Sequence, residues 1–263
     1  MGRKIAVVSG KGGVGKTTIA CGLGLALAKV GHSVCLVDLD VGLNNLDVLL
    51  GVENKVVYDL GDCVEGRCRI KQALIGVSSF DTLFLLPSMR FTKCDVAHSD
   101  IKSITDKLAC VFDFVIIDAP AGMGENFEMA VKSANEAIVV VTPHIASLRD
   151  ADKVISILKG ADIENISITV NRIRGDMVAR KEMLNHIQIS KLLKSQILGV
   201  IPESDDINLY SSFRFDKIAR SKAVVAFTLL ANNIKADKKI IYDYESKYKG
   251  VLGIIRRNIK RSI

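Results

Sequence analysis

A glycine-rich segment near the N-terminus has the residue types and spacing to hold phosphate groups. Residues 10–17 read GKGGVGKT, which fits the pattern G-x-x-x-x-G-K-[ST]. The glycines let the backbone turn its N–H groups toward phosphate oxygens, and a following helix adds the positive end of its dipole. Lys16 is placed to bridge the β- and γ-phosphates, and Thr17 to offer a hydroxyl to Mg²⁺. The segment predicts a nucleoside triphosphate site built from Gly10, Lys11, Gly12, Gly13, Val14, Gly15, Lys16, Thr17 and Thr18.

The same letters leave a dinucleotide fold open as an alternative. Gly10, Gly12 and Gly15 also fit G-x-G-x-x-G, and Asp38 follows at about the distance of a ribose-binding acid. The pair Lys16-Thr17 argues against this alternative, because a pyrophosphate held by a helix dipole needs no lysine. A triphosphate is therefore the favoured ligand.

A second acid stands where a magnesium-orienting group belongs. Asp118 ends the apolar run FVIID and is followed by Ala119, Pro120, Ala121 and Gly122. A lone acid at a strand end is often only a cap, but a phosphate loop upstream favours an acid that orients Mg²⁺ through water. The turn after it is suited to sense a γ-phosphate.

The elements that must position these groups are visible as short apolar runs alternating with helical stretches. Such an order predicts a mostly parallel sheet covered by helices on both faces, an α/β fold of the P-loop type. Helices are expected at Thr17–Val30, ending at Gly31, and at Ile101–Cys110, Ser147–Leu158 and Ala219–Ile234. Strands are expected at Ile5–Ser9, Val34–Leu39, Leu83–Pro87, Phe114–Asp118, Ala137–Thr142, Ile166–Asn171 and Ile197–Ile201.

The phosphate loop carries a second lysine, Lys11, just after its first glycine. With this two-lysine loop, the chain resembles the MinD/ParA family of deviant Walker A ATPases. The resemblance runs in order over roughly residues 3–205. It rests also on the segments LVDLDVGLNNLDVLLG, VVYDL, IIDAPAG, VVVTPHIASLRDADKV, VNR and GVIPES. The D-x-D-x-G-L-x-N-L-D stretch within the first of these is typical of the family's septum-placing branch.

The resemblance implies roles for matching residues around the phosphates. Lys11 is expected to reach the phosphates of a partner in a nucleotide-sandwich dimer, where it stabilises the charge in transfer. Asp40 is expected to orient and polarise the attacking water, and Asp38 to lie near the Mg²⁺ shell. Asn45 and Asp47 would belong to a switch that answers to the γ-phosphate. The simpler alternative, that Asp38 and Asp40 are ordinary loop acids, stays open.

The resemblance also implies an adenine pocket. Asn171 is expected to hydrogen-bond the adenine edge, and Arg172 and the segment Pro202–Asp205 to close over the base; Asn171 as a simple strand-end cap is the alternative. The segment Ser211–Phe227 lacks the Asn, Gly and Pro that the family often has there, and the segment between Gly160 and Ile187 looks short.

The C-terminal segment has a different character from the rest of the chain. Residues 244–263 read YESKYKGVLGIIRRNIKRSI, and at 100° per residue their apolar side chains fall within an arc of about 120°, flanked by basic ones. We expect a basic amphipathic helix that lies in a lipid headgroup layer. A core-docking helix and a nucleic-acid tail are the alternatives. The residues expected to meet the membrane are Tyr248, Val251, Leu252, Ile255, Arg256, Ile259 and Lys260.

Charge is concentrated in this tail. The whole chain has 36 basic and 29 acidic residues, a net charge of +7. Residues 247–263 hold six basic residues and no acid, which leaves 30 basic and 29 acidic residues in the rest. The body is nearly neutral, and with 5% aromatic residues and no Trp it does not have the composition of a base-stacking surface. No specific nucleic acid is expected as a partner.

Other sequence features limit the cellular compartment in which the protein is expected. An apolar run begins by residue 5, which leaves no room for a signal peptide, and no run approaches the roughly 18–20 residues of a membrane-spanning helix. The six cysteines include no C-x-x-C pair, and free thiols are expected. Residues 119–135 contain no cysteine, which argues against the iron–sulfur branch of the family.

The sequence thus predicts an ATPase domain over residues 1–243 and a membrane-targeting tail over 244–263. The expected cofactors are ATP or ADP with Mg²⁺. One tail should bind lipid weakly, whereas an ATP-bound homodimer presents two, so nucleotide state would control attachment to anionic phospholipid on the cytoplasmic face of the cell membrane. By resemblance, the protein places the division septum with a MinC-like inhibitor and a MinE-like activator, one of them docking at Ser147–Val154 with Asp150 and Asp152 exposed. The alternatives are a ParA-type DNA-partitioning ATPase and a flagellar-number regulator.

Overall fold

The computed structural model describes residues 1–41, 45–78, 80–89, 96–161, 163, 165–205 and 221–248. Its strands are β1 (Arg3–Val8), β2 (Val34–Asp38), β3 (Ile75–Gly76), β4 (Leu83–Leu86), β5 (Phe114–Asp118), β6 (Glu136–Val141), β7 (Asn165–Ile173) and β8 (Gln196–Pro202). Its longer helices are α1 (Lys16–Lys29), α5 (His98–Ala109), α6 (Glu125–Lys132), α7 (Ile145–Gly160), α9 (His186–Leu193) and α11 (Lys222–Asn233). Short helices are α2 (Leu46–Leu50), α3 (Leu60–Val64), α4 (Ile70–Ala73), α8 (Gly175–Ala179) and the 3₁₀ turns η1 (Glu53–Lys55) and η2 (Ser246–Tyr248).

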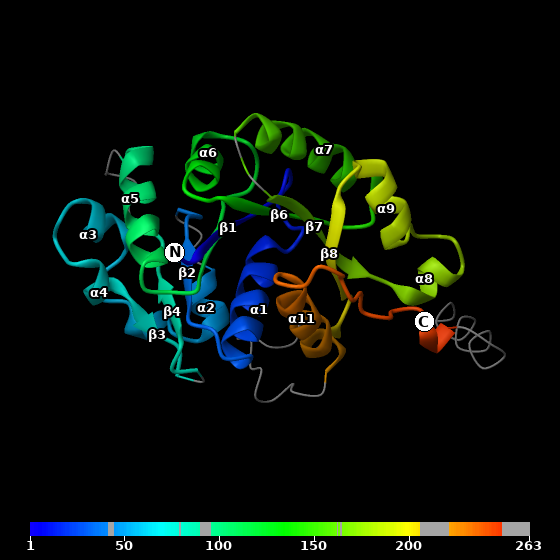
Figure 1. Cartoon of the computed structure of the whole chain (residues 1–263), viewed down its shortest axis with the longest axis horizontal. Coiled ribbons are helices and arrows are strands. Elements are labelled where there is room, and N and C mark those ends of the chain that lie inside the picture. The colour runs from blue at the N-terminus through cyan, green and yellow to red at the C-terminus, as the bar shows by residue number, and fades with distance from the viewer. Residues whose placement is uncertain are drawn as a thin grey trace.

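The strands form one sheet in the order β3-β4-β2-β5-β1-β6-β7-β8. Every pairing is parallel except that of β3 with β4 at the edge. Parallel strands need crossover connections, and here these are helices on both faces of the sheet. The mostly parallel, doubly covered α/β fold predicted from the sequence is confirmed (Figure 1).

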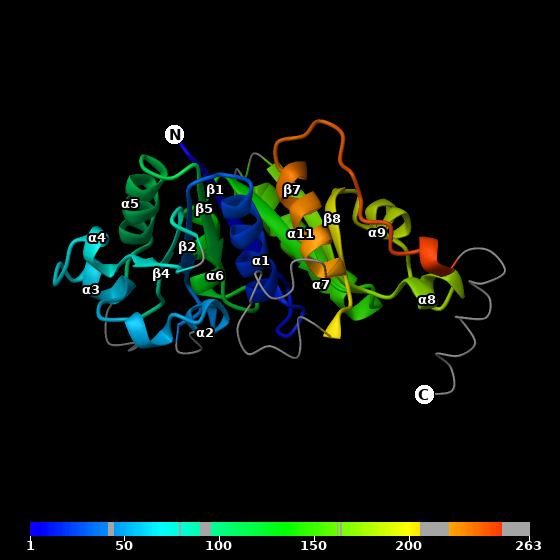
Figure 2. The same cartoon turned by 90° about the horizontal axis from the view of Figure 1, so that it is seen from below.

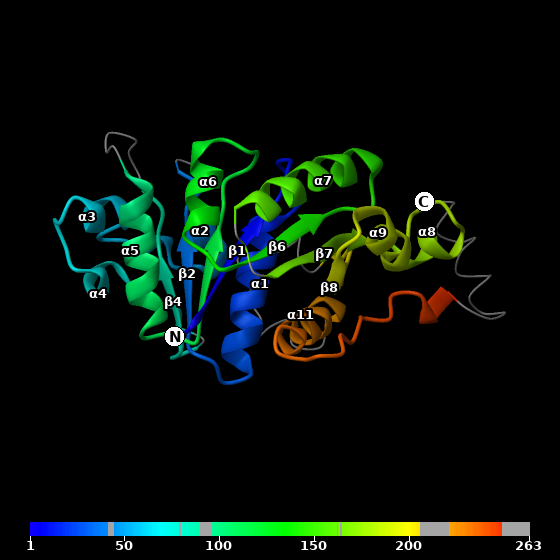
Figure 3. The same cartoon turned by 45° about the horizontal axis from the view of Figure 1, so that its top comes forward.

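Two apolar layers hold the helices against the sheet. In β1, Ala6 and Val8 face a layer that includes residues of α5, α6, α7 and α9, whereas Ile5 and Val7 face one that includes α1, α2 and α11. This alternation follows from the two-residue period of a strand. Figure 2 shows α1 and α11 side by side on one face, and Figure 3 shows α5, α6 and α7 on the other.

Glycines fix the close contacts beneath α1. A Cβ on Gly22 would overlap the ring of Phe227, so α1 and α11 can pack this closely only with glycine there. Helix α1 ends at Lys29, and Gly31 has φ +94°, the left-handed C′ residue that the sequence predicted. This packing holds α1 in place, and so it also fixes the position of the N-terminus of α1, which follows the phosphate loop.

All the parallel strands end at one edge of the sheet. The loops that follow β1, β2, β5 and β7 therefore meet there, which is where ligands bind in open α/β sheets. The residues predicted to hold phosphate, magnesium and base lie on these loops or at these strand ends.

Candidate nucleotide site

The phosphate loop connects β1 to α1. Gly13 and Gly15 have φ of +78° and +94°, which is the left-handed region where glycine is favoured. The hydroxyl of Ser9 donates a hydrogen bond to the carbonyl oxygen of Lys11 at 2.9 Å and so braces the start of the turn. The conformation of the loop therefore explains why glycine occupies positions 13 and 15.

Close neighbours leave no room for a side chain at two loop glycines, Gly10 and Gly15, whereas Gly12 is in ordinary contact with its neighbour. A Cβ on Gly10 would lie 2.6 Å from the carbonyl oxygen of Asp150 in α7, and one on Gly12 would lie 3.7 Å from Cβ of Ala121. A Cβ on Gly15 would overlap the side-chain amide of Asn171. The loop is therefore pressed between α7, the turn after β5 and the end of β7.

The two lysines of the loop have opposite environments. Lys16 begins α1 and is 6% exposed, and its positive charge acts on Asp118. Lys11 is exposed to solvent. The first turn of α1 carries no acidic residue, so the positive end of its dipole is not neutralised there. Backbone N–H groups, dipole and Lys16 together make a binding place for phosphate anions.

Asp38 and Asp118 lie side by side at the ends of β2 and β5, where they are register partners. They are 2% and 1% exposed. Asp38 accepts hydrogen bonds from the backbone N–H groups of Asp40, at 2.9 Å, and Leu46, at 3.5 Å. Among the described residues, neither carboxylate oxygen of Asp118 accepts a hydrogen bond of good geometry, although the nearby hydroxyl of Thr17 acts to lower the pKa of this carboxyl.

Burial and mutual repulsion make these carboxylates costly to ionise. Burial raises the pKa of Asp118 to about 8, with the negative charge of Asp38 as the next cause. Burial also raises the pKa of Asp38 to about 7, against the two backbone hydrogen bonds that lower it. The hydroxyl of Thr17 and the charge of Lys16 offset only part of this cost, so the pair calls for a cation beside it.

The groups present fit Mg²⁺. The ion prefers hard oxygen donors, few of them from protein, with substrate phosphates and water completing its shell. The hydroxyl of Thr17 and the carboxylate of Asp118 would hold it, with Asp38 nearby. When bound, the ion supplies positive charge to the phosphates and relieves the two buried acids.

The predicted water-orienting acid lies next to this pair. Asp40 is half-buried, and its backbone N–H is tied to Asp38. Asn45 is exposed before α2, and the carboxylate of Asp47 is buried and accepts a hydrogen bond from the N–H of Val48 at 2.7 Å. Residues 42–44 lie outside the described residues, so the roles of this stretch stay predictions.

The sequence placed Asn171 at the adenine, but its side chain reaches the phosphate loop. Its Nδ2 donates to the carbonyl oxygen of Val14 at 2.8 Å, and its Oδ1 accepts from the N–H of Arg172 at 2.9 Å. Arg172 has φ +56° and lies where the pairing of β7 with β8 is irregular between Val170 and Ile173. Such irregularities re-aim side chains, and here one turns Asn171 toward the loop. The contact was not predicted, because two residues 157 positions apart give no sequence signal of pairing.

The predicted base-closing residues lie at the end of β8. Pro202 is buried, and the N–H of Glu203 donates to the carbonyl oxygen of Ile173 at 3.0 Å. Arg172 is exposed beside them. Arg172 and Pro202 lie at the ends of the neighbouring strands β7 and β8, and an adenine contact remains a prediction for them.

The predicted partner helix, α7, packs on the phosphate loop. Asp152 is exposed, as predicted. Asp150 was also predicted to be exposed, but it is half-buried, and its backbone lies against Gly10. Ser147, at the start of the predicted surface, is buried and accepts a hydrogen bond from the N–H of Thr142 at 3.0 Å. The outward-facing part of the helix includes Ile145, with 62% of its side chain exposed.

Comparison with known proteins assigns this arrangement to a family. Residues 5–214 match the model of the CobQ/CobB/MinD/ParA nucleotide binding domain. The chain is 40% identical to the septum site-determining protein MinD of Bacillus subtilis over 262 residues, which is 97% of each chain. The chain belongs to the MinD family.

Solved structures agree with this family. This chain superposes with a TM-score of 0.84 on a chain of the MinC:MinD cell division protein complex of Aquifex aeolicus. The two are 36% identical, and the match covers 93% of this chain and 100% of that one. The MinD of Pyrococcus horikoshii, solved with Mg-ADP, gives a TM-score of 0.80 at 30% identity, covering 89% and 96%. The chain is accordingly a nucleotide-binding, Mg²⁺-dependent ATPase, and the dinucleotide alternative is excluded.

Two further expectations can be checked in the described part of the chain. Cys21, Cys35, Cys63, Cys68 and Cys110 are free thiols there, as predicted. In the same part, no helix combines the length and apolar character needed to cross a bilayer. Apart from Tyr248, the residues predicted to face lipid lie outside the described residues.

Proposed function

We propose that this protein is an ATP-switched, peripheral membrane ATPase that helps to place the division septum. The observation that carries the proposal is the division of labour between the two loop lysines. Lys16 is buried at the start of α1, where its charge acts on Asp118, whereas Lys11 is exposed and accessible to another chain. An exposed second lysine on a phosphate loop can reach a nucleotide held by another chain, as in a dimer that encloses two nucleotides.

In this dimer, each site would combine residues of both chains. The loop N–H groups and Lys16 hold the phosphates of the bound nucleotide, and Asp40 orients the attacking water. Lys11 of the opposite copy adds positive charge where the transferring phosphoryl group gathers negative charge. Hydrolysis then depends on dimerisation, because the isolated chain lacks that charge.

Attachment to the membrane would follow from the same dimer. The tail after Tyr248 carries the basic, amphipathic pattern, and each Lys or Arg near an anionic surface contributes about 1 kcal/mol at most. Ordering the segment consumes part of this, so one tail binds weakly. Two tails on one dimer bind by avidity, since the second meets the surface at an effective concentration of about millimolar.

A protein partner would act through α7. This helix presents an exposed face outward and contacts Gly10 of the phosphate loop on its inner side. A MinC-like inhibitor or a MinE-like activator docked there would bind a helix that directly contacts the phosphate loop through Asp150 and Gly10. The names of the relatives and the Aquifex complex support septum placement over DNA partitioning.

Liposome cosedimentation tests the proposal. Full-length protein should pellet with anionic vesicles in ATP and much less in ADP or without nucleotide. A truncation after Tyr248 removes residues 249–263 of the tail while keeping the packed residues before them, and should abolish pelleting. The variant Ile255→Glu interrupts the apolar stripe but retains every basic residue, and should do the same. Equal pelleting in ATP and ADP would contradict the nucleotide switch, and ATP-dependent pelleting by the truncation would contradict the tail assignment.

A further inference from the structure

The chain does not leave the body where α11 ends. Asn233, the last residue of α11, is 1% exposed. Its Nδ2 donates hydrogen bonds to the carbonyl oxygens of Leu198, at 2.7 Å, and Ile240, at 2.9 Å, while its Oδ1 accepts from the N–H of Ile240 at 2.9 Å. One buried side chain thus ties the returning chain to β8. We refer to residues 239–248 as the strap. Figure 2 shows it running from α11 past α9 to α8.

The far end of the strap is held by Tyr244. Tyr244 is the first residue of the predicted amphipathic segment 244–263, but it is only 7% exposed and lies within the body. Its hydroxyl accepts a hydrogen bond from the N–H of His186 at 3.3 Å and lies 2.6 Å from Nδ1 of the same residue. The two rings meet edge to face with centroids 5.7 Å apart. A buried hydroxyl satisfied in this way resists being pulled into water.

The backbone of the strap also requires a glycine beneath it. A Cβ on Gly175, at the start of α8, would overlap the carbonyl oxygen of Tyr244, and it would lie 3.1 Å from the ring of Tyr248. The strap can lie this close to α8 only because Gly175 has no side chain. Tyr248, the last described residue, is therefore held against the body, and the tail departs from this point.

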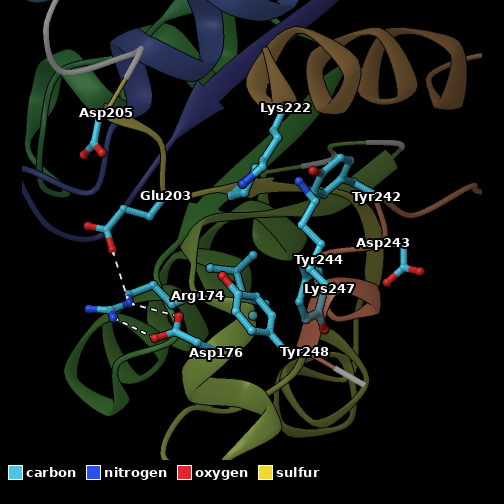
Figure 4. Close-up of a pocket in the computed structure, with 13 residues that line it drawn as sticks. Arg174, Asp176, Glu203, Asp205, Lys222, Tyr242, Asp243, Tyr244, Lys247 and Tyr248 are labelled. Carbon is cyan, nitrogen blue, oxygen red and sulfur yellow. Dashed lines mark hydrogen bonds and ion pairs between the residues drawn. The ribbon is translucent and has the colours of Figure 1, made fainter. Parts of the chain in front are cut away.

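This departure point adjoins the nucleotide end of the sheet. A cavity of about 430 Å³ separates the strap residues Tyr242, Tyr244 and Tyr248 from the predicted base-closing segment at the end of β8. Arg174 stands between them, 2.8 Å from the carboxylate of Asp176 and 3.9 Å from that of Glu203 (Figure 4). Arg174 follows Asn171 by three residues, and Asn171 is bonded to the phosphate loop.

We propose that the strap is a positioning element for membrane attachment: the contacts of Tyr244 with His186 and Gly175 fix the exit of the tail beside the nucleotide site. The inference rests on the proposed membrane switch. In a dimer joined at its nucleotide sites, exits held at this edge keep the two tails at a defined separation. Releasing about 10 residues per chain lets each tail wander over about 17 Å, which lowers the effective concentration of the second tail.

The expected result is a selective loss of the ATP-dependent part of binding. Tyr244→Ala removes the ring and the hydroxyl and should weaken pelleting in ATP about fivefold, with weak pelleting in ADP unchanged. Tyr244→Phe keeps the packing and should give a smaller loss. Tyr58→Ala, a half-buried tyrosine elsewhere on the body, is the matched control and should leave the ATP-dependent pelleting intact.

Three measurements keep the test decisive. Hydrogen exchange over residues 240–248 shows whether the strap is released, size-exclusion chromatography without lipid shows whether the ATP dimer still forms, and ATP turnover without lipid shows whether the site is intact. A released strap with an intact dimer and wild-type pelleting would overturn the inference. If Tyr244→Ala does not fold, Tyr244→Phe decides by the same comparison. Failure of the proposed switch itself would appear in the wild-type protein, as equal pelleting in ATP and ADP.

Discussion

The side-chain amide of Asn171, at the end of β7, donates a hydrogen bond of 2.8 Å to the carbonyl oxygen of Val14 in the phosphate loop. Both groups are buried, so the bond replaces one that water would otherwise supply. It fixes a loop whose glycines are free to adopt many conformations. The shape of the phosphate site is thus set partly from a strand two places away in the sheet.

We predict that Asn171→Ala weakens nucleotide binding about 5- to 150-fold, because a buried carbonyl left without a partner costs about 1–3 kcal/mol. Calorimetric titration with ADP measures the change. Asn165→Ala, at the exposed start of the same strand, is the control and should bind normally. Pyrophosphate separates the two roles: it should lose affinity to the same degree if Asn171 acts through the loop, and should bind normally if Asn171 contacts only adenine.

Asp38 and Asp118 form a buried pair, and we predict that replacing Asp118 raises the stability of the protein but lowers its activity. Asp118→Asn removes one of two adjacent buried carboxylates while keeping its shape. At pH 7 the nucleotide-free protein should gain about 1 kcal/mol of unfolding free energy, because burial raises the pKa of Asp118 and the cost of keeping this carboxyl protonated in the native state is absent from the amide. Mg²⁺-dependent ATP turnover should fall to background. Urea unfolding without nucleotide and a phosphate-release assay give the two readouts, and a destabilised variant would show that Asp118 has a structural partner instead.

Much of this fold could be predicted from runs of apolar residues. The expected strand Phe114–Asp118 matches β5 at both ends, and Gly31 is left-handed as its place after a helical pattern indicated. The short antiparallel strand β3 was not predicted, because two residues give no periodic signal. The phosphate loop was predictable because its chemistry depends on local spacing.

The contacts that sequence could not give are those between distant side chains. The hydrogen bond from Asn171 to Val14 joins two distant chain segments, and no pattern in the sequence indicates that they are in contact. Tyr244 fits both a lipid-facing stripe and a body contact, since helical periodicity says where an apolar side chain points but not what covers it. His186, 58 residues earlier, decides between the two for this residue.

The exposed and buried lysines of the loop should fail in different ways. Lys16→Ala should abolish ATP binding, because Lys16 faces the phosphates of its own chain. Lys11→Ala should bind ATP as a monomer but lose the dimer and turnover. Calorimetry and light scattering in ATP make the distinction. A stable ATP dimer of Lys11→Ala would count against the role of this residue in the partner site.

Mixing two inactive variants tests whether Lys11 acts on the opposite chain. Asp40→Ala should bind ATP and dimerise without turnover. A mixed dimer with Lys11→Ala keeps one of the two Lys11 residues that join the chains, so it should form where the Lys11→Ala homodimer does not. One of its sites combines an intact Asp40 with the intact Lys11 of the other chain. The mixture should therefore regain up to half of the wild-type rate per dimer. If Lys11 acts within its own chain, each chain of the mixture still lacks one required group and turnover stays absent.

An ion pair on the opposite end of the sheet should make stability depend on acid pH. Lys4, in β1, is 7% exposed and pairs with Asp106 of α5, which also accepts a hydrogen bond from Lys102 at 2.8 Å. Partial burial acts to raise the pKa of Asp106, but the hydrogen bonds and charges of the two lysines outweigh it and lower the pKa. A carboxyl whose pKa is lowered on folding stabilises the native state above its unfolded pKa of about 3.9, and the benefit disappears as pH falls through the folded value.

Asp106→Asn should therefore destabilise the protein at pH 6, by about 1 kcal/mol once the partial exposure of Asp106 is taken into account, since it leaves the ammonium of Lys4 without its charged partner. The difference from wild type should shrink as the pH is lowered from 5 to 3. Urea unfolding at both pH values measures it, with Asp100→Asn, in the first turn of the same helix, as a comparison that leaves the Lys4 pair in place. A deficit that stays constant over this range would show that Asp106 contributes by packing and not by its charge.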